Sequence, residues 1–233
     1  MSAPLIEKHA KAIKLRKMGW SYSAIKNEIE VSKSSLSLWL RDYPLSGAQL
    51  DMLKSHSEIR IENFRRTMRK KRENRLRNVY EVEKKSLLPI TKRELYIAGL
   101  MMYWGEGLKA SSCTVSVANT DPQVILFIKH WLKECLEVDV SEMRVKLHLY
   151  LDMNVMQATL YWSKLLGISV KQFVKPHIKV SRMVDLDQKG LFGHGTCNLT
   201  VHSTKLKEKI VMGYKAIADS VGRPGFEPGT GRV

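Results

Sequence analysis

Residues 19–42 read GWSYSAIKNEIEVSKSSLSLWLRD, and this stretch decides the fold of the N-terminal part of the chain. Ser21 and Ser32 each precede a short segment with apolar residues at helical spacing. Both serines are candidate N-caps, because a serine hydroxyl accepts a hydrogen bond from a free N–H of the first helical turn. We therefore expect helices over residues 22–29 and 33–41, separated by a tight turn.

A further helix is expected upstream, over residues 6–18, where apolar side chains recur on roughly one helical face. Gly19 can end this helix, and Pro44 limits the last one because a proline disfavours helical geometry in the residue before it. Three short helices with a tight turn between the last two match the helix-turn-helix plan. The sequence thus predicts a helix-turn-helix domain over residues 1–46.

The same stretch resembles the helix-turn-helix of resolvases and related regulators. The apolar positions of that pattern hold Ile25, Ile29, Val31, Leu36 and Leu40. Lys26 and Glu30 depart from it, since a small alanine and a turn glycine are usual there. The resemblance implies binding to double-stranded DNA, with the start of the third helix in the major groove. The DNA-contacting residues would be Lys33, Ser34, Ser35 and Ser37. Trp39 is expected in the core and not at a base. The alternative to DNA binding is a small three-helix bundle that contacts other proteins.

The chain is strongly basic: 39 Lys and Arg residues stand against 23 Asp and Glu residues, a formal net charge of +16. Such an excess favours polyanions, with nucleic acid first and an acidic membrane surface second. The most apolar stretch, residues 95–104, has about half the length that a membrane span needs, so no membrane partner is expected. The three cysteines, Cys113, Cys135 and Cys197, form no CxxC pair. We expect reduced thiols in a cytoplasmic, nucleoid-associated protein.

Basic residues concentrate in the middle of the chain. Nine of the 18 residues over 60–77 are Lys or Arg, and neither proline nor glycine occurs between Ser57 and Leu88. We therefore predict one long helix within a basic helical linker over residues 47–90. Contact with DNA phosphates is the preferred interpretation, because a surface that serves solubility alone normally mixes both signs of charge. The candidate phosphate contacts are Arg65, Arg69, Lys70, Lys71 and Arg72.

Helical patterns alternate with short strand-like runs over residues 91–218. Strands are expected near residues 114–118, 145–149, 173–180 and 197–202, with helices between and after them. The predicted fold class is α+β, with a mostly antiparallel sheet and helices on one face. Lys146 and His148 occupy polar positions of a strand, where they would either lie on a DNA backbone or simply face solvent.

Two consecutive segments of this region resemble the LAGLIDADG homing endonucleases: YIAGLMMYWGEGLK at 96–109 and SVANTDPQVILFIKHWLK at 116–133. The resemblance implies that Glu106 is a catalytic carboxylate and a ligand of Mg²⁺ at the DNA backbone. It also implies a homodimer in which residues 95–105 of two chains pack together. The glycine-to-acid spacing is longer than in the family, residues 153–167 resemble an added helix, and one acidic motif is present instead of two.

The sequence is therefore compatible with two alternative functions. One is a homing-type, Mg²⁺-dependent DNA endonuclease of a mobile element; the other is a non-cleaving transcriptional regulator without a cofactor. In the second case Glu106 only shapes a helix terminus at a dimer interface. RNA binding is a weaker alternative, because no strand carries an aromatic-rich stacking motif.

Residues 219–233 are expected to form a disordered tail. The sequence GFEP at 225–228 is what the T-arm of a tRNA gene would encode.

Overall fold

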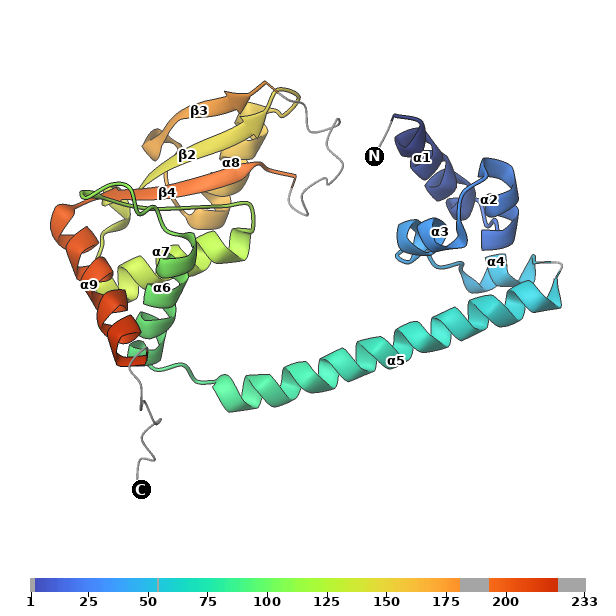
Figure 1. Ribbon diagram of the computed structural model, residues 1–233. Coiled ribbons are helices and arrows are strands. Elements are labelled where there is room, and N and C mark those ends of the chain that lie inside the picture. The colour runs from blue at the N-terminus through green and yellow to red at the C-terminus, as the bar shows by residue number, and fades with distance from the viewer. Residues whose placement is uncertain (1–2, 54, 181–192, 222–233) are drawn as a thin grey trace. The chain divides into compact units, whose positions relative to one another are not determined.

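The computed structural model describes residues 3–53, 55–180 and 193–221. Contacts divide the chain into two compact units, Met1–Leu88 and Pro89–Val233. The described residues combine helices with one four-stranded sheet, which confirms the predicted α+β class (Figure 1). No helix among the described residues is long and apolar enough to cross a membrane.

Five helices form the described part of the first unit. They are α1 (Ala3–Lys17), α2 (Tyr22–Ile29), α3 (Lys33–Leu40), α4 (Gly47–Asp51) and α5 (His56–Leu87). Ser21 and Ser32 cap α2 and α3 as predicted, and their hydroxyls accept the backbone N–H of Ala24 and Ser35. The core of the three-helix part consists of Ala12, Ile25, Ile29, Leu36 and Leu40, with Trp39 partly buried against it.

The turn between α2 and α3 accommodates both departures from the resolvase pattern. Glu30 adopts a left-handed conformation, with φ 50° and ψ 59°, and its N–H donates to the carbonyl of Lys26. This conformation favours glycine, because a Cβ crowds the backbone there. The Lys26 side chain is exposed and does not disturb the core. The chain thus makes the tight turn without the usual glycine.

The second unit is built on a sheet with strand order β1-β4-β2-β3. Its strands are β1 (Thr114–Asn119), β2 (Arg144–Tyr150), β3 (Phe173–Lys179) and β4 (Thr196–His202). Its helices are α6 (Lys92–Glu106), α7 (Pro122–Leu136), α8 (Val155–Leu166) and α9 (Thr204–Val221), and short 3-10 turns occur at Val140–Glu142 and Val170–Gln172. The β1–β4 and β4–β2 pairs are antiparallel and the β2–β3 pair is parallel, so the sheet is mostly antiparallel as predicted. The tail expected from residue 219 is helical as far as Val221, and its remainder lies outside the described residues.

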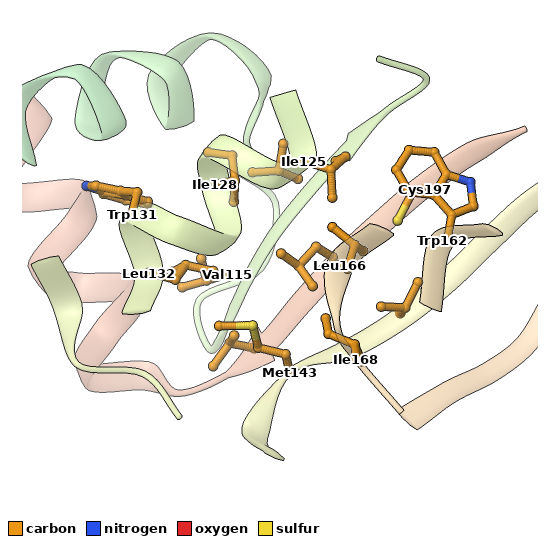
Figure 2. Packing of buried hydrophobic residues seen from close by; sticks show 14 of the residues in the cluster. Val115, Ile125, Ile128, Trp131, Leu132, Met143, Trp162, Leu166, Ile168 and Cys197 are labelled. Atoms are coloured by element: carbon orange, nitrogen blue, oxygen red, sulfur yellow. The ribbon is translucent and has the colours of Figure 1, made fainter. Parts of the chain in front are cut away.

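The core of this unit lies between the sheet and its helices. Val145, Leu147 and Leu149 of β2 are buried, whereas the residues between them are more exposed, so one face of the sheet is covered. Trp131 of α7 and Trp162 of α8 are fully buried in this layer (Figure 2). Each indole N–H has a carbonyl partner in the same unit, Tyr96 and His194 respectively.

Helices α6 and α7 approach closely at Gly99. A Cβ at this position would lie only 2.1 Å from Nε1 of Trp131, so a larger residue fits only if the tryptophan moves. Gly105, in the last turn of the same helix, has nothing within 4 Å of such a Cβ. Gly99, which lies within the segment 95–105 expected to pack against a second chain, is thus covered by a tryptophan of its own chain.

These two glycines give a matched test of the core. We expect Gly99→Ala to lower the free energy of unfolding of this unit by about 1–3 kcal/mol, because the tryptophan must shift. Gly105→Ala should leave stability unchanged or raise it by up to about 1 kcal/mol, because alanine is the better helix former. Chemical denaturation followed by tryptophan fluorescence measures both. Equal effects of the two substitutions would contradict the close approach at Gly99.

Candidate nucleic-acid interface

A buried ion pair joins α1 to α5. Arg16 and Glu62 are only 2% and 7% exposed, and Nη2 of the arginine lies 2.7 Å from Oε2 of the glutamate. The second guanidinium nitrogen, Nη1, donates to Oε1 at 3.3 Å and to the carbonyl of Trp20. Nε donates to the carbonyl of Tyr43. All three guanidinium nitrogens therefore have acceptors, which is the condition under which a buried charge is tolerated.

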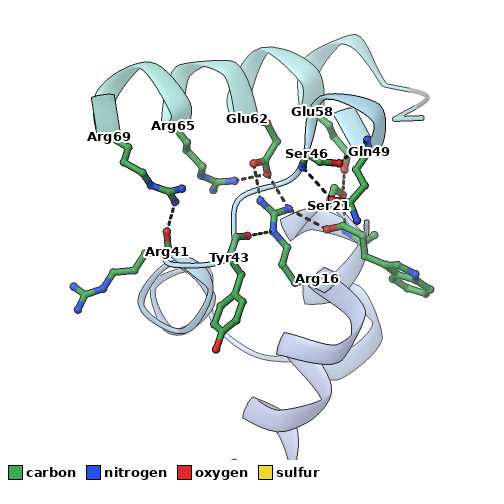
Figure 3. A network of polar contacts seen from close by, with 12 residues as sticks. Arg16, Ser21, Arg41, Tyr43, Ser46, Gln49, Glu58, Glu62, Arg65 and Arg69 are labelled. Carbon is green, nitrogen blue, oxygen red and sulfur yellow. Dashed lines mark hydrogen bonds and ion pairs between the residues drawn. The ribbon is translucent and has the colours of Figure 1, made fainter. Parts of the chain in front are cut away.

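Further polar contacts extend this junction along α5 (Figure 3). The Ser21 hydroxyl donates to Glu58, one turn before Glu62. Arg65 donates to Glu62 and lies over the ring of Tyr22, with 3.7 Å between its Cζ and the ring centroid. One turn later, Arg69 donates to the carbonyl of Arg41 at the end of α3. The N-terminal part of α5 is thus fixed against the helix-turn-helix.

These contacts divide the predicted phosphate-binding residues into two groups. Arg65 and Arg69 hold α5 in place and are only partly exposed. Lys70, Lys71 and Arg72 are exposed and form no ion pair in the described part of the chain. The second group therefore offers the cations that a phosphate could reach.

The third helix exposes most of the residues predicted to contact DNA. Lys33, Ser34 and Ser37 are exposed, whereas Ser35 is half-buried and its hydroxyl lies 2.9 Å from that of Ser32.

Leu38 and Arg41, near the C-terminal end of α3, are also exposed, but they were not among the predicted DNA contacts. Leu38 follows Ser34 by four residues, and Arg41 follows Ser37 by the same interval. Residues four apart lie on one face of a helix, so the sequence spacing could have placed both residues beside the predicted contacts.

A groove runs between α3 and α5 on the same unit. Its volume is about 790 Å³, and Ser37 lies in its wall together with Phe64 and Met68. Six cations line it against two acids, and these charged residues are Arg41, Arg65, Arg69, Lys71, Arg72 and Arg75 against Asp42 and Glu73. The third helix and the basic helix therefore contribute to one electropositive surface.

The second unit carries a polar sheet face opposite its helices. None of the four strands contains an acidic residue. Lys146 is exposed and His148 half-buried on this face, as predicted from the alternation, and Arg144 precedes them. The paired strand β3 brings His177 against His148, with ring centroids 5.4 Å apart, and Lys179 over the ring of Tyr150.

The charge of this face acts on His148. Its pKa is lowered, first by partial burial and then by the neighbouring His177, Lys146 and Lys179. Each of these causes disfavours the imidazolium. A bound polyanion would act in the opposite direction, because negative charge favours the protonated ring.

Glu106 is exposed at the C-terminal end of α6, between Gly105 and Gly107. Its Oε2 accepts a hydrogen bond from the Asn119 side-chain amide at 3.4 Å. Among the described residues, no three His, Cys, Asp or Glu side chains gather in a way that could hold a metal ion. A hard divalent cation takes several oxygen ligands, and the described residues bring a single carboxylate to this point. They therefore do not complete a metal site at Glu106 within one chain.

The turn that follows Glu106 is held firmly. Tyr103 donates its hydroxyl proton to the carbonyl of Leu108 at 2.8 Å, and the buried Lys207 donates to both of these oxygens. Burial raises the pKa of Tyr103 to about 12 and lowers that of Lys207. A Cβ at Gly107 would lie 2.5 Å from the Tyr103 carbonyl oxygen, so the turn requires glycine there.

The buried ion pair predicts a large effect on stability. Glu62→Gln should destabilise the first unit by about 3–5 kcal/mol, because it leaves the Arg16 charge buried without its counter-ion. Glu28→Gln is the matched control: it breaks an ion pair with Lys11 of the same 2.7 Å length, but both side chains are about half exposed. We expect it to cost less than about 1 kcal/mol. Thermal unfolding followed by circular dichroism measures both; similar losses would contradict a special role for the buried pair.

Comparison of the chain with protein-family models, with curated proteins and with solved structures finds no match. Its function is therefore inferred from the charge, exposure and geometry of the two surfaces described above.

Proposed function

We propose that this protein binds double-stranded DNA in a sequence-specific manner through α3 and α5. The observation that carries the proposal is the groove between these two helices, which six cations line beside the exposed face of α3. A surface of one sign, fixed beside an exposed helix, is what recognition of a charged duplex requires.

The two helices take different parts in this proposal. The exposed lysine and serines of α3 can donate hydrogen bonds to base edges in the major groove, which is where sequence is read. Lys70, Lys71 and Arg72 directly follow Arg69, the last anchoring residue of α5, and can neutralise phosphates. Because Arg65 and Arg69 already have protein partners, we assign them to positioning α5 instead of to direct phosphate contact.

The polar sheet face of the second unit is proposed as a further contact with the DNA backbone. Its cations Arg144, Lys146 and Lys179 are accompanied by histidines and by no strand carboxylate. The resemblance to LAGLIDADG endonucleases, which act on DNA, agrees with this assignment. Together with the helix-turn-helix, this face would give the protein two surfaces for contact with DNA.

The recognition and phosphate roles are separable by experiment. A duplex selected from a random library by the wild-type protein serves as the specific site. Lys33→Ala with Ser37→Ala should reduce the preference for this site over random DNA, since a good base contact contributes about 1–3 kcal/mol of discrimination. Changing Lys70, Lys71 and Arg72 to Gln should weaken binding to both DNAs. It should also lower the slope of log K against log salt by up to about 0.9 for each phosphate that is no longer neutralised.

The control for net charge lies on α9, where Lys205, Lys209 and Lys215 are exposed. Changing these three lysines to Gln removes the same charge and should leave the salt slope nearly unchanged. Fluorescence anisotropy over a salt series measures all variants. An equal decrease of the slope in both triple variants would mean that the loss of net charge alone explains the smaller slope of the α5 variant. That result would contradict the assignment of Lys70, Lys71 and Arg72 to the DNA-binding surface.

Endonuclease activity is a second candidate function, favoured by the rigid turn that presents Glu106 at the end of α6. The carboxylate would have to act with ligands from a second chain and from the DNA phosphate, because the described residues of its own chain bring no further metal-binding group to it. The face of α6 that stays exposed, including Ile97, Trp104 and Gly105, is where a second chain would pack. A Mg²⁺ ion held there would stabilise charge at the cleaved phosphate.

Glu106→Gln tests whether the protein is an endonuclease or a non-cleaving regulator. If the protein is a nuclease, the wild type cuts a plasmid carrying the selected site with Mg²⁺ and not with EDTA, and the variant binds the site without cutting. Gel electrophoresis of the plasmid and anisotropy of the duplex give the two readouts. A wild-type protein that binds this site but never cuts it, with Mg²⁺ or Mn²⁺, would leave the non-cleaving regulator.

A further inference from the structure

The distal half of α5 has no packing partner among the described residues of its unit. Every residue over 70–87 is exposed, whereas the first half of the same helix is anchored through Glu58, Glu62, Arg65 and Arg69. An isolated helical segment of this length is only marginally stable in water, because most helical stability in proteins comes from packing.

Apolar side chains form a short row on this exposed segment. Leu76, Val79 and Val82 are 52%, 53% and 64% exposed. They follow each other at intervals of three residues, so each lies about 60° around the helix from the one before, and the row covers roughly 120° of the surface around Val79. The row covers only the middle of the exposed segment 70–87, and its central residue is Val79.

Charges are arranged symmetrically about the same residue but with opposite signs. Arg75 and Arg77 precede Val79 by four and two residues, and Glu83 and Glu81 follow it by the same intervals. At six residues the pattern continues with Glu73 before and Lys85 after. None of these six side chains forms an ion pair in the described part of the chain.

We propose that the distal half of α5 pairs with the same segment of a second copy of this chain, antiparallel and centred on Val79. In this orientation each residue lies at the height of the residue equally far from Val79 on the other side. The apolar rows then meet, and Arg75 of one copy lies level with Glu83 of the other on the same face as Val79. Glu73 lies level with Lys85 farther from the contact, whereas Arg77 and Glu81, two residues from Val79, lie on the opposite face of the helix. A parallel pair would instead set Arg beside Arg and Glu beside Glu, which is unfavourable.

The pairing gives the two helix-turn-helix units a defined separation. Glu62, where α5 is anchored, lies 17 residues before Val79. At about 1.5 Å per residue, the two anchor points would be about 50 Å apart along the pair. Only this consequence for DNA rests on the proposed function; the self-association itself does not.

A charge-swap experiment on the full chain without DNA tests the pairing. Arg75→Glu with Arg77→Glu makes the segment predominantly acidic around the apolar row, and Glu81→Arg with Glu83→Arg makes it predominantly basic. Each double variant alone should dimerise at least about tenfold more weakly than the wild type, because the two Arg75–Glu83 cross-pairs of the dimer become repulsive. An equimolar mixture of the two should form a heterodimer, and the quadruple swap should dimerise like the wild type.

Sedimentation equilibrium at low and moderate ionic strength measures these association constants. Circular dichroism confirms that each variant remains helical, and Lys205→Glu with Lys209→Glu on α9 serves as the control for altered net charge. A monomeric wild type, double variants that dimerise as well as the wild type, or a mixture that fails to associate would each overturn the pairing. DNA binding by the wild type is scored separately, so failure of one proposal is distinguishable from failure of the other.

Discussion

The ion pair between Arg16 and Glu62 fixes how the basic helix is attached. The guanidinium is almost completely buried, and its nitrogens bind the Glu62 carboxylate and the carbonyls of Trp20 and Tyr43. A buried charge tolerates neither the loss of its partner nor a shift of a turn, because either change leaves it uncompensated. The first turns of α5 consequently have one position against the three-helix core, and Arg65 and Arg69 add contacts in the same register.

This attachment is what makes α3 and α5 parts of one surface. A flexible basic segment would raise affinity for any polyanion, whereas a fixed one presents its cations at set distances from the exposed face of α3. In the proposed function, Lys70, Lys71 and Arg72 would be phosphate contacts that accompany base contacts, so they would support recognition of a site as well as general affinity. Beyond them the helix becomes a different surface, with an apolar row and balanced charges, suited to a second copy of the chain.

Local structure could be predicted from the sequence because its signals are local. The serine caps, the long run without glycine or proline and the alternation over residues 145–149 each act within a few residues. Contacts between distant residues could not be predicted in this way. Nothing near Glu62 indicates that its partner is Arg16, and strand patterns do not reveal that β2 and β3 are parallel. For the same reason, the sequence predicted Arg65 and Arg69 as phosphate contacts without revealing that they hydrogen-bond to Glu62 and to the carbonyl of Arg41.

In the proposed function, α3 and the basic part of α5 contact the same DNA at once. Acetylation of lysine side chains by a small reagent, read by mass spectrometry with and without the selected duplex, tests this most directly. We expect Lys33, Lys70 and Lys71 to become less reactive together as DNA is added, while Lys205 on α9 reacts as before. Protection of Lys33 with unchanged reactivity at Lys70 and Lys71, or the reverse, would contradict a single surface built from both helices.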